Sequence, residues 1–156
     1  MERASYAIAL GSNRRTVHGS PRETLHAALD ALGGVAAASP VIETAPLGPS
    51  RRRFANAVAI VASEEMPPEL LTRLKAIERA FGRRRGQRWG ERALDLDILL
   101  WSGGAWASPG LVVPHAQFRR RGFVMGPLAA IAPGWRDPLT GHTMRQLLAR
   151  TRNSRV

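Results

Sequence analysis

Residues 94–100 read Leu94-Asp95-Leu96-Asp97-Ile98-Leu99-Leu100. Hydrophobic and acidic side chains alternate at the start of this segment, which is typical of a β-strand with one buried face. A period of two places the side chains at 94, 96, 98 and 100 on the core face. Asp95 and Asp97 then share the opposite face, with their Cα atoms about 6.6 Å apart.

Two carboxylates on one face of a strand are suited to a hard cation. Mg²⁺ is commonly bound through one or two carboxylates, with waters and substrate phosphates as its other ligands. The alternative is that Asp95 and Asp97 form only the solvated face of an amphipathic strand. The sequence just before them favours the metal site, because residues 83–92 carry five arginines and punctuating glycines. Magnesium and arginine together neutralise charge during phosphoryl transfer.

The rest of the chain predicts an α+β fold around this strand. A first strand is expected at Ala4–Leu10. A helix follows Ser20-Pro21-Arg22-Glu23, which has the pattern of a capping box with proline at the first helical position. The longest helix begins at Met66-Pro67-Pro68-Glu69 and ends near Gly82. The other expected elements are strands at Val41–Thr44, Phe54–Val61, Leu94–Trp101 and around Val112 and Val113, and helices at Phe123–Ile131 and Thr143–Thr151.

The order of the first hundred residues is therefore β-α-β-β-α-β. This order indicates a ferredoxin-like core, with an antiparallel sheet, two helices on one face and additional C-terminal helices. No repeat or interdomain linker interrupts the sequence, so residues 1–156 are expected to form a single domain.

Composition narrows the possible functions. The chain has no cysteine and a formal net charge of +11, and Lys75 is its only lysine. The absence of cysteine excludes thiol catalysis and Cys-ligated zinc. With Lys75 as the only lysine, a P-loop cannot be assembled. The excess of arginine favours a polyanionic ligand. No apolar run reaches the roughly 20 residues of a membrane span, and a signal-peptide core is not evident, so a cytoplasmic protein without membrane contact is expected.

Short motifs spread along the chain, in a fixed order, resemble one enzyme family. They are Gly11-Ser12-Asn13, Thr44-Ala45-Pro46-Leu47-Gly48, Asn56, Glu78 to Arg83, Arg88-Trp89-Gly90 to Arg92, Leu94-Asp95-Leu96-Asp97-Ile98, Val113-Pro114-His115, and Arg121-Gly122-Phe123 with Pro127-Leu128. Together they resemble the 6-hydroxymethyl-7,8-dihydropterin pyrophosphokinases of folate biosynthesis. The resemblance extends from about residue 6 to residue 148.

This resemblance implies transfer of pyrophosphate from ATP to the hydroxymethyl group of the pterin, with AMP as the second product. It implies two Mg²⁺ ions held by Asp95 and Asp97, with Arg83 and Arg92 as further catalytic residues. The pterin would contact Thr44, Leu47, Phe54, Asn56, Trp89 and Phe123. The co-substrate ATP would contact Glu78, Arg83, Arg85, Trp89, Arg92, Ile98, His115 and Arg121. A monomer acting on small molecules, without nucleic acid, is expected.

Two other interpretations remain open from the sequence. A ferredoxin-like sheet with exposed aromatic residues and excess arginine can bind single-stranded nucleic acid. The second interpretation is that the chain is a paralogue of the enzyme that has lost catalysis. A carboxylate pair without metal would repel a phosphate backbone, which argues against the nucleic-acid module. Asn56 is not readily explained as a structural residue, because a polar amide within an apolar strand needs a partner, and a ligand edge can supply one.

Overall fold

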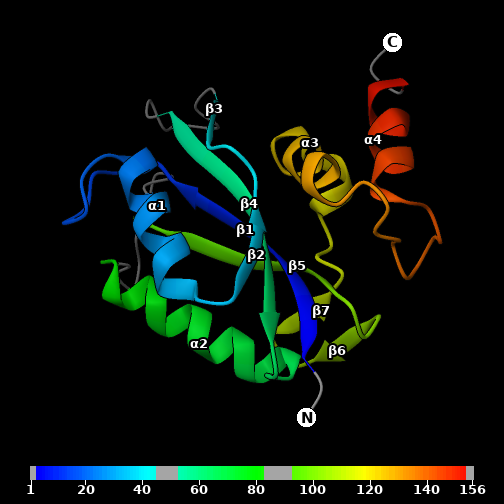
Figure 1. The fold of residues 1–156 in the computed structure, drawn as a ribbon, viewed down its shortest axis with the longest axis horizontal. Helices are drawn as coiled ribbons and strands as arrows, with labels where there is room; N and C mark the ends of the chain where they lie inside the picture. Colours follow the sequence, from blue (N-terminus) through cyan, green and yellow to red (C-terminus); the bar gives the residue numbers. More distant parts are fainter. Residues whose placement is uncertain (1–2, 45–52, 83–92, 154–156) are drawn as a thin grey trace.

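The computed structural model describes residues 3–44, 53–82 and 93–153 of the 156-residue chain (Figure 1). Its elements in chain order are β1 (Ala4–Ser12), α1 (Pro21–Leu32), β2 (Val35–Ala38), β3 (Ile42–Thr44), β4 (Phe54–Ser63), α2 (Pro67–Ala80), β5 (Asp95–Trp101), β6 (Trp106–Ser108), β7 (Leu111–Val113), the 3₁₀ turn η1 (Phe118–Arg120), α3 (Gly122–Ile131) and α4 (Met144–Asn153). The predicted α+β class is confirmed.

The main sheet is antiparallel, with the strand order β2-β4-β1-β5 and β3 paired to β4. β4 lies between β2 and β1, which is the split β-α-β arrangement predicted from the sequence. β2 and β3 pair with successive parts of β4, because Ser39 interrupts them: its Oγ accepts a hydrogen bond from Val58 N at 2.9 Å. The strand predicted at Val41–Thr44 is thus accompanied by a second strand, β2, that was not predicted.

Helices cover both faces of the sheet (Figure 1). α1 and α2 pack on one face, where Leu25 and Leu70 join a core with Ile8, Leu96 and Ile98. The first helix is held at its start by the predicted capping box: Ser20 Oγ accepts from Glu23 N at 3.2 Å, and Ser20 N donates to Glu23 Oε1 at 3.0 Å.

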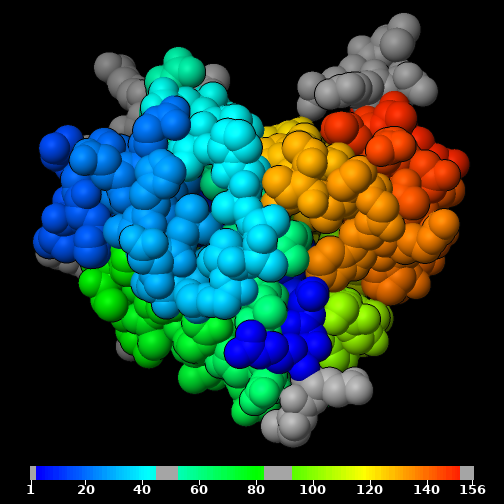
Figure 2. All heavy atoms as spheres, viewed as in Figure 1, coloured from blue at the N-terminus to red at the C-terminus, as the bar shows by residue number. Residues whose placement is uncertain are grey.

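The opposite face is covered by the C-terminal part of the chain. η1, α3 and α4 form a second core there, in which Phe118, Met125 and Leu128 pack against Ala7 and Val58 of the sheet. In the space-filling view this C-terminal part, yellow to red, forms one side of the molecule, and the N-terminal part, blue to green, forms the other (Figure 2). The face that carries Asp95 and Asp97 is therefore the face on which α3 packs.

One expectation for β5 was wrong. Ala7 pairs with Leu100 and Ile8 with Ile98, so Leu99 is an extra residue that shifts the register between β1 and β5. Beyond this bulge the alternation changes phase, and Leu100 belongs to the core beneath α3 rather than to that of Leu96 and Ile98.

Candidate active site

A hollow on the α3 face of the sheet forms the first of two neighbouring pockets. On the central strand β1, Gly11 lies opposite both Asn56 of β4 and Asp95 of β5, and Ala9 lies opposite Asp97. Opposed residues on neighbouring strands point to the same face. The small residues of β1 therefore leave open space between the larger side chains of β4 and β5. The resulting pocket has a volume of about 310 Å³.

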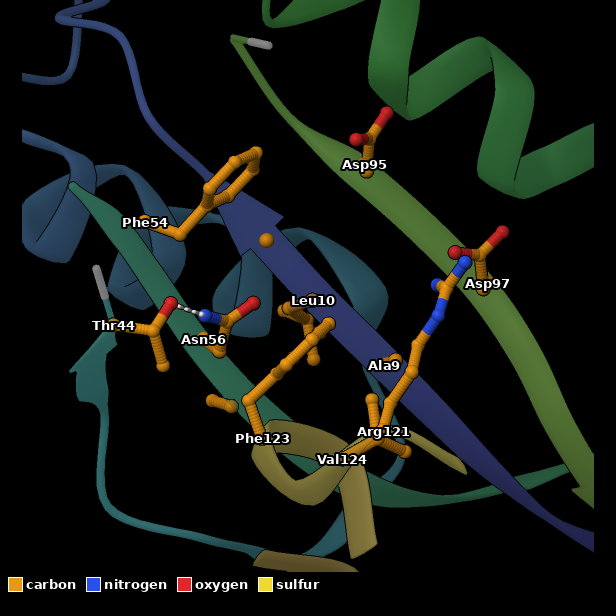
Figure 3. Close-up of a pocket in the computed structure, with 12 residues that line it drawn as sticks. Ala9, Leu10, Thr44, Phe54, Asn56, Asp95, Asp97, Arg121, Phe123 and Val124 are labelled. Carbon is orange, nitrogen blue, oxygen red and sulfur yellow. Dashed lines mark hydrogen bonds between the residues drawn. The ribbon is translucent and has the colours of Figure 1, made fainter. Parts of the chain in front are cut away.

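The first pocket has aromatic walls and an amide group. Phe54 from β4 and Phe123 from α3 both contribute to its lining (Figure 3). Asn56 is only 5% exposed, and its Nδ2 donates to Thr44 Oγ1 at 3.1 Å. This bond orients the amide so that Oδ1 points away from Thr44 and toward the floor at Gly11, where an added Cβ would lie 3.3 Å from it. A flat ring with a hydrogen-bond donor on its edge fits this lining.

The second pocket, of about 540 Å³, opens on the other side of β5. Its wall includes the helix α2, the strand β7 and the residues that follow β7. Buried Glu78 of α2 faces β5, and its Oε2 accepts a hydrogen bond from Leu96 N at 2.8 Å. The lining residues are Leu71, Lys75, Glu78, Asp95, Leu96, Asp97, Ile98, Gly110, Leu111, Val112, His115, Ala116 and Arg121.

The two pockets share Asp95, Asp97 and Arg121. Both carboxylates are half-buried on the same face of β5, as the alternation predicted, and the Arg121 side chain extends toward Asp97 (Figure 3). The donor set fits a hard cation such as Mg²⁺, which uses carboxylate oxygens. Within residues 3–44, 53–82 and 93–153, groups of three or more potential acidic or histidine ligands do not occur, so substrate or water oxygens would complete the coordination.

His115 provides a neutral nitrogen donor beside this junction. Its backbone N–H donates to Leu99 O at 3.0 Å, and its Nδ1 accepts from Gln117 N at 3.1 Å. Burial lowers the pKa of His115, nearby Asp97 acts in the opposite direction, and Arg121 lowers it further; the net pKa lies below the usual value. The imidazole is therefore neutral near pH 7, and with Nδ1 accepting, its proton is on Nε2.

Most of the residues singled out from the sequence gather around these pockets where the structure describes them. Thr44, Phe54, Asn56 and Phe123 line the first pocket, and Glu78, Ile98 and His115 line the second. Leu47, Arg83, Arg85, Trp89 and Arg92 lie outside the described residues. Ala9 and Lys75 also line the pockets, although neither was predicted from the sequence as a site residue. Lys75 could have been predicted from its spacing to Glu78, because residues three apart on a helix lie on the same face.

The fold itself is one that solved structures contain. A crystal structure of Plasmodium falciparum HPPK-DHPS, wild type with pteroate, matches 96% of this chain with a TM-score of 0.76 and 13% sequence identity. A second HPPK-DHPS structure, in complex with substrates, matches 99% with a TM-score of 0.77. The present chain spans 44% and 45% of those longer chains. At this identity the likeness concerns the fold.

The fold and the joined pockets define an α+β protein in which two neighbouring pockets meet at a carboxylate pair. A sequence profile described as 7,8-dihydro-6-hydroxymethylpterin-pyrophosphokinase matches residues 7–133. The chain belongs to this family, as its motifs predicted.

Curated relatives support the same assignment over most of the chain. The 2-amino-4-hydroxy-6-hydroxymethyldihydropteridine pyrophosphokinase of Pseudomonas aeruginosa is 44% identical over 148 residues, which cover 91% of this chain and 88% of that protein. The enzyme of the same name from Haemophilus influenzae is 43% identical over 131 residues, with 80% and 79% covered.

Proposed function

We propose that the two joined pockets bind the two substrates of a pyrophosphoryl transfer, with hydroxymethyldihydropterin in the first pocket and ATP in the second. The reaction is that of the family to which the chain belongs. The assignment of pockets to substrates is carried by one observation: both pockets open onto Asp95, Asp97 and Arg121. A group passing from one ligand to the other would cross this junction.

The first pocket suits the pterin because its groups match a flat, neutral, nitrogen-rich ring. Phe54 and Phe123 supply ring faces for stacking, and the Asn56 Oδ1 supplies an acceptor for an N–H on the ring edge. The hydrogen bond to Thr44 fixes the amide before a ligand arrives, which lowers the entropic cost of binding. Leu47 and Trp89, which lie outside the described residues, are proposed to contact the same ring.

The second pocket suits ATP because cationic and neutral donors surround its mouth. Arg121 brings a permanent positive charge, and the neutral His115 offers Nε2–H to a phosphate oxygen. Lys75 adds a second cation on α2, while Ile98 and Leu71 offer apolar contact to a base. Glu78, bonded to Leu96 N, holds β5 against α2 at the point between the two aspartates.

Asp95 and Asp97 would hold two magnesium ions at the junction. When bound, the ions neutralise charge on the phosphate oxygens of ATP. The oxygen-only donor pair on one strand face fits this role. Arg83, Arg85 and Arg92 are proposed to add positive charge from the segment outside the described residues.

In the transfer, the hydroxymethyl oxygen forms a bond to the β-phosphorus of ATP. The bond from that phosphorus to the oxygen bridging to the α-phosphate breaks, AMP leaves with that oxygen, and the hydroxyl proton passes to solvent. The chain contributes by holding the two reacting atoms in line and by placing Arg121 where negative charge builds up. It needs no covalent intermediate on a side chain.

We further propose that residues 1–156 act as one domain and as a monomer in the cytoplasm, on small molecules without nucleic acid. The sheet shared by both hydrophobic cores supports one domain. Along the part of the chain that the structure describes, none of the helices combines the length and hydrophobicity of a membrane span.

The direct test is release of AMP from ATP by the purified full chain. AMP should form only when 6-hydroxymethyl-7,8-dihydropterin and Mg²⁺ are both present, in equal amount to the pterin diphosphate. A chain that bound RNA in a salt-sensitive, Mg²⁺-independent manner and released no AMP would instead be a nucleic-acid-binding module.

A further inference from the structure

An ion pair between the partly exposed Arg119 and the buried Asp137 lies outside both pockets, in the C-terminal part of the chain. Arg119 Nε donates to Asp137 Oδ2 at 2.6 Å, and Arg119 Nη2 donates to Asp137 Oδ1 at 2.8 Å. The Asp137 side chain is 0% exposed and also accepts from Leu139 N and the Thr140 hydroxyl, each at 3.0 Å. Both carboxylate oxygens are thus bonded twice, in the two-pronged geometry that fixes an arginine most tightly.

Arg119 is fixed from other directions as well. Its backbone carbonyl lies 3.3 Å from the Thr151 hydroxyl of α4, which shares its hydrogen with Leu147 O at 2.9 Å. Its guanidinium carbon lies 4.6 Å from the centroid of the Phe118 ring, and Phe118 is fully buried in the core beneath α3. The turn η1 is therefore bound to the 137–140 turn, to α4 and to the core through consecutive residues.

The helix that follows η1 carries two residues of the proposed site. Arg121 is its N-cap residue, and Phe123 is in its first turn. Among the described residues the Arg121 side chain makes no capping hydrogen bond, and the first helical residue is Gly122. A helix start with glycine and without a side-chain cap is weakly defined by its own sequence. Met125 and Leu128 pack the body of the helix on the sheet, so the position of its first turn depends also on what holds the residues before it.

We propose that Asp137 is a positioning residue for the transfer reaction: by clamping Arg119 it fixes the junction of η1 and α3, and so holds Phe123 at the first pocket and Arg121 between the two pockets. This inference rests on the proposed assignment of the pockets. A buried ion pair adds little net stability compared with apolar residues of similar size, but breaking one partner is costly and frees the other. Its main effect here is on geometry.

The substitution Asp137→Asn in the full chain tests the proposal. Asparagine keeps the shape but removes the charge and turns an acceptor into an NH₂ group facing the guanidinium. A misplacement of a reacting group by about 1 Å can reduce activity 100-fold. Because Phe123 would be displaced from the first pocket, we expect part of this loss as a rise of about tenfold or more in the KM for the dihydropterin. The Mg²⁺ concentration for half-maximal activity should stay within twofold, because Asp95 and Asp97 are on β5.

Two further variants separate positioning from stability. Arg120→Met removes a positive charge from the same 3₁₀ turn as Arg119, but from an exposed side chain, and should leave the KM within twofold. Arg119→Lys keeps the charge with a single donor group and should give a smaller rise in the KM than Asp137→Asn. All assays are made at a temperature where circular dichroism shows each variant folded.

The inference is overturned if Asp137→Asn lowers the melting temperature but leaves the dihydropterin KM at the wild-type value. If Asp137→Asn does not fold, Arg119→Lys decides in the same way. A wild-type chain without pterin-dependent AMP release would refute the proposed function itself. Normal wild-type activity with an unchanged Asp137→Asn KM would refute only the positioning role.

Discussion

Replacing Asn56 with leucine removes the amide that faces the first pocket and keeps the number and branching of the side-chain heavy atoms. The amide is 5% exposed, and its Nδ2 is bonded to Thr44, so Oδ1 is the atom that would accept from the pterin. Loss of this acceptor leaves a ligand N–H buried without a partner, which costs about 1–3 kcal/mol. The dissociation constant for the dihydropterin should therefore rise by about 5- to 150-fold.

Titration calorimetry measures this effect for each pocket separately. The dihydropterin is titrated in the presence of Mg²⁺ and a non-hydrolysable ATP analogue, and the analogue is titrated alone with Mg²⁺. The affinity for the analogue should stay within twofold, since Asn56 does not line the second pocket. Gln146→Leu removes an exposed amide away from both pockets, where its Oε1 accepts from Thr143 N at 2.8 Å, and as a control should alter neither affinity.

Two results would refute the reasoning. An unchanged dihydropterin affinity in Asn56→Leu would mean that the first pocket does not bind the ring edge. An equal loss of both affinities would mean that the substitution disturbs the sheet as a whole rather than one pocket.

Other expectations follow from the floor of the pocket and from a buried phenol. In the same titrations, Gly11→Val should weaken dihydropterin binding by about tenfold or more and leave the affinity for the ATP analogue unchanged, because even its Cβ would lie 3.3 Å from Asn56 Oδ1. A dihydropterin affinity equal to that of wild type would contradict this. Burial, followed by the charges of Glu65 and Glu69, raises the pKa of Tyr6 to about 12 from 10.0. Because the pKa is higher in the folded protein, the neutral phenol stabilises the fold fully below pH 10. This stabilisation is lost as the pH rises toward 12. Urea unfolding should show a loss of up to about 3 kcal/mol in the free energy of unfolding over that range, and Tyr6→Phe should show less pH dependence. Identical pH profiles for Tyr6→Phe and wild type would contradict the assignment.

Much of the fold could be predicted because its elements have strong local signals. Ser20 and Glu23 mark the start of α1 by a capping box, and the alternation around Asp95 and Asp97 correctly places both on one face. These signals depend on neighbouring residues alone, so they can be read without tertiary information.

The elements that were missed have weak local signals. Val35–Ala38 contains only small or exposed apolar residues, without the alternation of a half-buried strand, and becomes β2 through pairing with β4. The bulge at Leu99 arises from the pairing of β5 with β1, which the sequence of β5 alone does not contain. Long-range pairing thus decided both features.

The sequence indicated several residues that line the two pockets but not the arrangement of the pockets. The acidic pair and Asn56 could be identified from residue type and position. Two pockets meet at Asp95, Asp97 and Arg121 because α3 packs over the sheet. The small residues Gly11 and Ala9 leave the space between the strands open. The role of Asp137 depends on a contact across 18 residues of sequence.

The most direct test of the joined-pocket account is turnover by Asp97→Asn. The account predicts a fall of about 100-fold or more in kcat/KM for AMP release, while circular dichroism and the dihydropterin dissociation constant remain close to wild type, because the side chain faces the junction and not the core. Turnover within a few-fold of wild type would contradict the assignment of this carboxylate to the reaction.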